Sequence, residues 1–120
     1  MKKLLFFIIP VFSILLFSFT VPYHQLFNTT LQVTVRDELG NVVEGAEVVL
    51  YKSESDYEQN ANAAIEPLTT NVKGVVTIKK LEPIEYYVNV SKGDANNFGA
   101  GVQTGVLEAK KMNKVTIIIE

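Results

Sequence analysis

Apolar and polar residues alternate with a period of two through much of the chain after residue 30. Val33 and Val35 alternate with polar neighbours, and Ala46, Val48 and Leu50 do so again after a turn. Side chains at every second position of a strand point to the same face of a sheet. The pattern therefore predicts two half-buried strands joined by a turn.

The same alternation continues to residue 120 in short runs separated by turn residues. We predict seven strands, at residues 31–36, 46–51, 67–70, 75–79, 86–91, 99–108 and 115–119. Ten of their side chains are expected to point inward: Val33, Val35, Val48, Leu50, Ile78, Tyr86, Val88, Val90, Val115 and Ile117. Short strands at regular spacing, with no strong helical pattern, favour a seven-stranded antiparallel Greek-key β-sandwich over residues 30–120.

The first 21 residues have a different pattern. Lys2 and Lys3 precede an almost wholly apolar run from Leu4 to Val21. A short basic region before such a run is typical of an export signal, and its charges keep that end in the cytoplasm. Cleavage after Thr20 is favoured over a retained membrane anchor, although the cleavage motif is poor.

This reading divides the chain into an export segment at 1–20, a linker at 21–29 and the sandwich domain at 30–120. The domain is then expected outside the cytoplasm, in the periplasm, on the cell surface or secreted. It would contact the membrane only through residues 1–21, and only if they are not removed.

Composition excludes several classes of function. The chain has no cysteine, which rules out disulfides, thiolate metal sites and a cysteine nucleophile. Its formal net charge is −2 and its lysines are scattered, so nothing predicts a nucleic-acid surface. The one histidine, His24, falls in the linker, where it is badly placed to serve as the base of a serine triad. We therefore predict no enzyme and no cofactor.

The stretch from Lys52 to Glu66 is long and polar for a connection in a small β domain. Such connections are either functional or mobile, so we expect a mobile loop that presents an interaction surface. Glu54, Asp56 and Glu58 alternate within it, and their carboxylates are weak candidates for a Ca²⁺ site. The loop lacks the glycine and the closing glutamate of an EF-hand, which favours a solvated loop instead.

Four aromatic residues are candidates for an exposed binding patch that recognises protein or glycan: Tyr51, Tyr57, Tyr87 and Phe98. Tyr57 is the expected anchor of the loop, because it is a large side chain among small polar ones. The alternative is that Tyr51 and Tyr87 only cover the outer face of a sheet and Phe98 caps its end.

Two segments together resemble the carboxypeptidase regulatory-like family. They are VRDELGNVVEGAEVVL at 35–50 and TNVKGVVTIKKLEPIEYYVNV at 70–90, where a glycine turn opens a strand and a Leu-x-Pro turn precedes a tyrosine. Ile84 stands where the family usually has glycine. The resemblance implies a transthyretin-like, prealbumin-type sandwich, but a shared fold does not carry a function with it.

Two chemistries known from related sandwiches are not expected here. The transthyretin-like hydroxyisourate hydrolase uses histidines and an arginine, whereas this chain has only His24. Related surface proteins form an internal Lys–Asn isopeptide bond, but residues 31–36 contain no lysine and 115–119 contain no asparagine.

These observations favour an exported, non-catalytic binding or structural module at the bacterial cell envelope, with a protein or glycan partner. The alternative is a calcium-dependent adhesion module or small-ligand carrier that uses the 53–62 loop.

Overall fold

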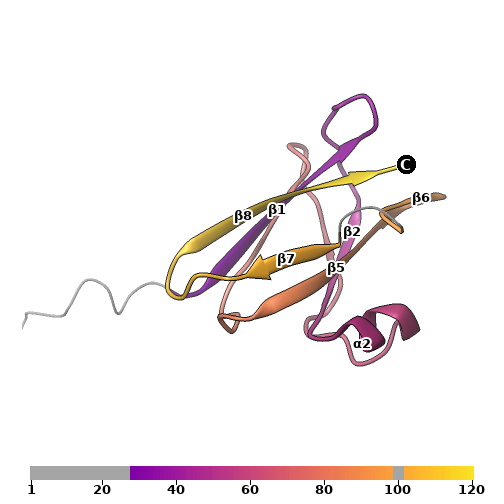
Figure 1. Ribbon diagram of the computed structural model, residues 1–120. Helices are drawn as coiled ribbons and strands as arrows, with labels where there is room; N and C mark the ends of the chain where they lie inside the picture. The colour runs from indigo at the N-terminus through magenta and orange to yellow at the C-terminus, as the bar shows by residue number, and fades with distance from the viewer. Residues whose placement is uncertain (1–27, 99–101) are drawn as a thin grey trace, which may run out of the picture.

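The computed structural model describes residues 28–98 and 102–120, which form two packed β-sheets and one short helix (Figure 1). The elements in chain order are β1 (Thr30–Asp37), β2 (Glu47–Tyr51), α2 (Glu54–Gln59), β3 (Leu68–Thr69), β4 (Val75–Ile78), β5 (Glu85–Lys92), β6 (Ala95–Asn96), β7 (Gln103–Val106) and β8 (Met112–Ile119).

The smaller sheet has three strands in the order β4-β1-β8. β1 pairs with β4 in antiparallel fashion, with Val33 opposite Val76. On its other side β1 pairs with β8 in parallel over its whole length, from Thr30 opposite Met112 to Asp37 opposite Ile119. The first and last strands of the domain therefore lie side by side.

The larger sheet has five strands in the order β3-β2-β5-β6, with β7 also paired to β5. β2 and β5 are antiparallel, with Leu50 opposite Val88 and Tyr51 opposite Tyr87. The pairing of β5 with β7 is irregular, because its register shifts between Glu85 and Tyr87.

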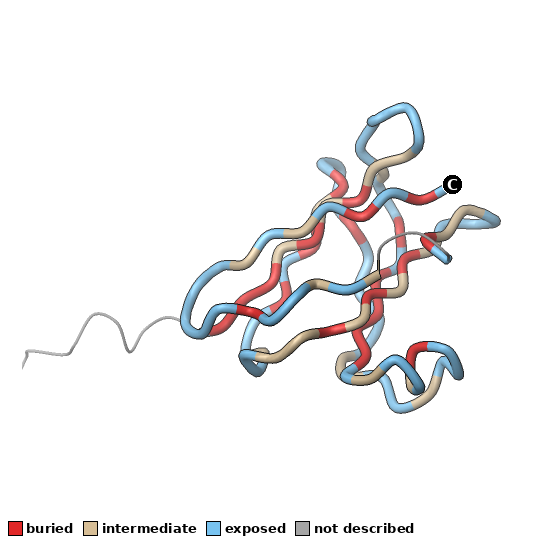
Figure 2. The backbone as a smooth tube through the Cα atoms, in the orientation of Figure 1, coloured by how far each residue is buried: buried red, intermediate tan, exposed pale blue. Residues whose placement is uncertain are grey.

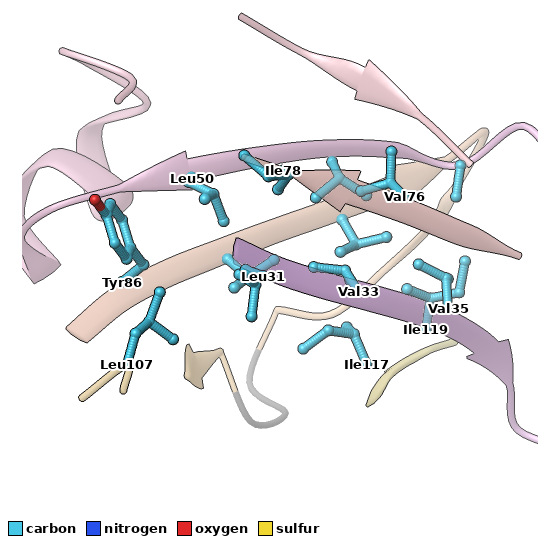
Figure 3. Close-up of a cluster of buried hydrophobic side chains, with 14 residues drawn as sticks. Leu31, Val33, Val35, Leu50, Val76, Ile78, Tyr86, Leu107, Ile117 and Ile119 are labelled. Atoms are coloured by element: carbon cyan, nitrogen blue, oxygen red, sulfur yellow. The ribbon is translucent and has the colours of Figure 1, made fainter. Parts of the chain in front are cut away.

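The inner faces of the two sheets enclose one hydrophobic core. Buried residues alternate with more exposed ones along β1, β5 and the second half of β8 (Figure 2). The core extends from Tyr86 and Leu107 at one end to Val35 and Ile119 at the other (Figure 3). Of the ten side chains predicted to point inward, nine are buried, and Val115 is half-buried and packs against the same cluster.

The predicted all-β sandwich is confirmed, with two differences in detail. The described residues form eight strands and not seven, because residues 95–96, which lie between two of the predicted strands, form the short strand β6. The pairing of β1 with β8 is parallel, whereas a wholly antiparallel sandwich was expected. Turn signals between neighbouring runs predict hairpins well, but β1 and β8 are far apart in sequence and no turn relates them.

Residues 1–27, which include the predicted export segment and His24, lie outside the described residues. Within the described part of the chain, no helix is long and apolar enough to cross a membrane.

Candidate functional site

An open groove of about 570 Å³ lies at the end of the sandwich where Val35 and Ile119 close the core. The loop after β1, the strand β6 and the end of β8 meet at this end of the molecule (Figure 1). We call it the end groove, and eight residues line it: Asp37, Glu38, Leu39, Val43, Lys92, Ala95, Ile119 and Glu120.

One wall of the groove is the loop after β1, which is held in a fixed shape by its own polar groups. The carboxylate of Asp37 accepts hydrogen bonds from the backbone N–H groups of Leu39 and Asn41, each at 3.0 Å. The guanidinium of Arg36 donates to the carbonyl of Gly40 at 2.7 Å. An aspartate that bonds to the backbone two residues on is a common device for fixing a turn. Leu39 is thereby presented to solvent, with 87% of its surface exposed.

The base of this loop is anchored by Thr70 and Gly74. The buried hydroxyl of Thr70 accepts from the N–H of Ala46 at 2.9 Å and donates to the carbonyl of Val43 at 2.7 Å. Gly74 has a φ of +72°, and a Cβ there would lie 2.8 Å from the carbonyl oxygen of Val35. Only glycine fits so close to a neighbouring backbone, so this turn fixes where the loop starts.

The opposite wall is β6, which hydrogen bonds to the end of β8. The N–H of Glu120 donates to the carbonyl of Asn96 at 3.1 Å, and the N–H of Asn96 donates back at 3.2 Å. This pair joins the two sheets at the groove. The ammonium of Lys92, at the end of β5, donates to the carbonyl of Glu44 across the loop.

The groove combines an apolar floor with an acidic rim. Leu39, Val43, Ala95 and Ile119 supply the apolar part, whereas the charged side chains are Asp37, Glu38 and Glu120 against the single Lys92. Three acids against one base give a formal charge of −2. Among the described residues, no group of three or more potential metal ligands is close together. The arrangement suits binding of an apolar side chain flanked by positive charge.

The predicted loop at Lys52–Glu66 contains the helix α2, so the expectation of a connection without regular structure is wrong. Ser53 caps the helix by accepting a hydrogen bond from the N–H of Asp56 at 3.1 Å, and Asn60 ends it with a φ of +50°. The N–H of Ala64 then donates to the carbonyl of Leu50 at 2.8 Å. The spacing Ser-x-x-Asp at 53–56 is the signal that could have predicted the helix.

The aromatic candidates do come together, but mostly as a second core. The ring of Tyr57 lies 6.0 Å from that of Tyr51, 6.4 Å from that of Tyr87 and 6.0 Å from that of Phe98. Tyr51 and Tyr57 are buried with Val49, so neither belongs to an exposed patch, and Tyr51 covers the outer face of its sheet as the alternative predicted. α2 covers the outer face of β2 and β5, and Tyr57 is the side chain by which it does so. Of the four, only Phe98 is largely exposed, at 57%.

Burial sets the chemistry of Tyr57. Its hydroxyl has no hydrogen-bond partner. Desolvation raises the pKa of Tyr57 above its ordinary value of 10.0, and the nearby Tyr51 raises it further. A buried hydroxyl without a partner is costly, so this position is held by its ring and not by its oxygen.

The three acids proposed for Ca²⁺ do not converge. Glu54 and Glu58 are four residues apart on α2 and lie on one side of it, whereas Asp56 is two residues from each and lies on the other. The carboxylate of Asp56 accepts a hydrogen bond from the side-chain amide of Asn62 at 3.2 Å. Two of the acids fall in the first turn of the helix, where negative charge is favourable without a metal.

The last strand does contain an asparagine, contrary to prediction, because β8 begins at Met112. The amide of Asn113 donates to the carbonyls of Thr30 at 3.2 Å and Glu108 at 3.1 Å, and its oxygen accepts from the N–H of Glu108 at 2.8 Å. β1 contains no lysine. The absence of a Lys–Asn cross-link therefore stays a prediction. The side chain of Asn113 instead stabilises the turn before β8 through these hydrogen bonds.

Several important residues were not predicted. Asn97 is wholly buried and clamps β5, accepting from the N–H of Val90 at 3.0 Å and donating to the carbonyl of Val88 at 2.8 Å. Leu107 is buried in the core just after β7, whose pairing with β5 is shifted in register, whereas the neighbouring Val106 is exposed. The end groove was also missed, since its residues come from four places in the chain.

Comparison with known proteins gives a fold but no family. No protein-family model matches the sequence, and no curated protein matches it. Among solved structures, the chain is similar to the pilus 2b backbone protein of group B streptococcus, with a TM-score of 0.52 and 17% sequence identity. The match covers 77% of this chain and 40% of the pilus protein chain, so it spans well under half of that protein. At this identity the likeness establishes the β-sandwich fold alone.

Proposed function

We propose that this chain is an exported, non-catalytic β-sandwich that works as a binding or structural module at the bacterial cell envelope. The observation that carries the proposal is the similarity of its fold to a pilus backbone protein. The basic and then apolar N-terminus supports export independently of that similarity.

The finer assignment within this proposal is a carboxypeptidase regulatory-like domain of the prealbumin type. It is supported by the two resembling segments, which include the turn at Asn71–Gly74, closed by a hydrogen bond of 2.9 Å between the N–H of Gly74 and the carbonyl of Asn71.

Within this function, the end groove is the proposed contact surface. Its exposed Leu39 and its acidic rim would hold a protein segment that carries an apolar residue beside a basic one. This surface replaces the 53–62 loop of the calcium-dependent alternative, because α2 directs its acids to opposite sides.

Export is tested by fractionating cells that express the full chain. We expect the protein outside the cytoplasm, and we expect Lys2→Glu with Lys3→Glu to reduce that fraction, since those charges set the orientation. A cytoplasmic enzyme serves as the fractionation control. Recovery of the unchanged chain wholly in the cytoplasm would contradict the proposal.

The groove is tested by a photo-crosslinking amino acid at position 39 of the exported protein in cells. We expect a defined adduct there, and none from the same amino acid at the exposed Lys79, which follows β4 at the far end of the domain. Ala95→Trp should fill the groove and abolish the adduct, whereas the matched Ala109→Trp should not. Equal adducts at positions 39 and 79, or no effect of Ala95→Trp, would remove the groove from the proposal.

A further inference from the structure

The outer edge of β8 is the longest unpaired strand edge among the described residues. β8 has eight residues and pairs only with β1, apart from the pair between Glu120 and Asn96 beyond its end. The other edge strands of the two sheets are short: β4 and β7 have four residues each, and β3 and β6 have two. A long free edge presents a row of N–H and C=O groups that can pair with another chain.

The hydrogen bonds show which residues of β8 face outward. The N–H of Thr30 donates to the carbonyl of Lys111 at 2.9 Å, so odd-numbered residues of β8 direct their backbone groups toward β1. At the other end, both backbone groups of Glu120 face away from β1, toward Asn96. Successive residues alternate, so four residues direct their N–H and C=O to the free edge: Met112, Lys114, Thr116 and Ile118.

The side chains of these four residues lie on the outer face of the sheet and are exposed. Met112 and Ile118, at the two ends of the row, are large and apolar, with 54% and 42% of their surfaces exposed. Lys114 and Thr116 lie between them. The row is therefore apolar, polar, polar, apolar, which is suited to pairing with its own reverse.

We propose that two copies of this chain associate by antiparallel pairing of their β8 edges, with Met112 opposite Ile118 and Lys114 opposite Thr116. In this register each of the four residues exchanges both backbone hydrogen bonds with its opposite in the second copy. A two-fold axis passes midway between the Val115 residues of the two copies, which lie opposite each other. The two three-stranded sheets become one continuous sheet. Such self-complementary pairing closes a dimer and leaves no further β8 edge free.

The neighbouring registers are less favourable. Moving the strands by two residues in one direction places Lys114 opposite Lys114 of the second copy, and like charges directly opposite are destabilising. Moving them the other way places Met112 opposite Glu120, whose backbone groups are already bonded to Asn96. A shift by one residue would set outward groups against inward ones. The proposed register avoids all three problems and places two apolar pairs at its ends.

The absence of cysteine makes a direct test possible. Two differently tagged copies of the full chain are expressed together, one with Lys114→Cys and the other with Thr116→Cys. Residues opposite each other in a hydrogen-bonded pair have Cα atoms about 5.5 Å apart, within the range that a disulfide spans. Diagonal neighbours are about 7–8 Å apart, so each variant alone should cross-link poorly.

We expect disulfide-linked heterodimers on a non-reducing gel, well above either homodimer. Thr77→Cys, on the exposed side of the other edge strand β4, is the matched control. It should form no disulfide and should run as a monomer on the non-reducing gel. A Lys114→Cys homodimer as abundant as the heterodimer would contradict the register. Absence of cross-linked dimer, or cross-linking of β8 only to other proteins, would overturn the proposal.

A second measurement uses charge and does not depend on oxidation. Thr116→Lys places an ammonium group opposite Lys114 of the second copy at two symmetric positions, and it should weaken the dimer about tenfold. Adding Lys114→Glu to that variant should restore association, because each lysine then faces a glutamate. Thr77→Lys is the control. If Thr116→Lys leaves the dimer unchanged, or the double variant fails to restore it, the proposal is wrong.

Discussion

The outer faces of the two sheets differ in polarity and in whether another element covers them. The outer face of the three-stranded sheet carries half-buried Gln32, Thr34 and Arg36 on β1, and no element formed by residues 28–98 or 102–120 covers it. The outer face of the five-stranded sheet carries Val49 and Tyr51, which are buried under α2. The first face is polar and compatible with water, whereas the second is apolar and is covered by the one helix of the described residues.

This comparison shows what the segment after β2 is for. A strand with one apolar face needs a cover on that face only. β2, with the sequence EVVLY, is apolar on both faces, so both of its faces must be covered by other elements. The segment 52–66 provides the second cover through Tyr57, and Ala64 and Ile65 continue into the edge of the main core. The segment 52–66 is therefore a structural element of the sandwich. The difference between the covered and the uncovered face leads to four predictions.

The largest effect should come from the shared core, which both sheets need. Val88→Asp buries a carboxylate at a position with no exposed surface. The cost is several kcal/mol, roughly the whole stability of a small domain, so the variant should not fold. Circular dichroism checks this, and Lys79→Asp, on the surface, is the control. A Val88→Asp protein that melts like the wild type would contradict the core assignment.

Replacing residues 52–66 by Asn-Gly should destabilise the domain strongly. A short turn would restore the hairpin but would leave Val49, Tyr51 and Tyr87 exposed to water, and burying a large side chain contributes about 2 kcal/mol. Chemical denaturation measures the loss. An equally stable shortened domain would show that α2 is dispensable, as expected for a simple loop.

Single substitutions at Tyr57 separate its ring from its hydroxyl. Tyr57→Ala should cost about 3 kcal/mol, because it empties the space between α2 and the sheet. Tyr57→Phe should be neutral or stabilise the domain by up to about 1 kcal/mol, because it removes a buried hydroxyl that has no partner. On the uncovered face, Thr34→Ala should change stability by less than about 0.5 kcal/mol. A Tyr57→Phe variant as unstable as Tyr57→Ala would mean that the hydroxyl matters.

The smallest effect is a loss of stability at alkaline pH. The pKa of Tyr57 is raised above 10.0 in the folded protein, so the folded state holds this proton more tightly than the unfolded chain does. Stability from this group is complete below pH 10 and declines as the pH rises above that value. Melting of the wild type and Tyr57→Phe from pH 8 to pH 11 should show a smaller decline in the variant. Parallel declines would assign the effect to other groups.

The contrast between the faces also explains what the sequence could predict. Strict alternation in β1 and β5 identified the core residues of both strands, because each has one apolar and one polar face. Turn residues at Asn71 and Gly74 placed the turn before β4, which connects the two sheets. The partner of β1 and the cover of β2 could not be read in this way, since both depend on residues distant in sequence. Helix α2 has six residues, and its one buried side chain gives no periodic signal.

The candidate site was harder to predict than the fold. The four aromatic candidates lie together around Tyr57, but which of them face water depends on the position of α2. The end groove needed the register that places Ile119 opposite Asp37 and the pair between Glu120 and Asn96. No short motif encodes such an arrangement.

Hydrogen exchange at single amides tests most directly whether the 52–66 segment is part of the sandwich. The N–H groups of Tyr57 and Ala64, which bond to Ser53 at 3.1 Å and Leu50 at 2.8 Å, are the ones to follow. We expect Ala64 to exchange almost as slowly as the strand amide of Val88, and Tyr57 to be clearly slower than the exposed Glu38. Exchange of Tyr57 and Ala64 at the rate of an open loop would contradict the account.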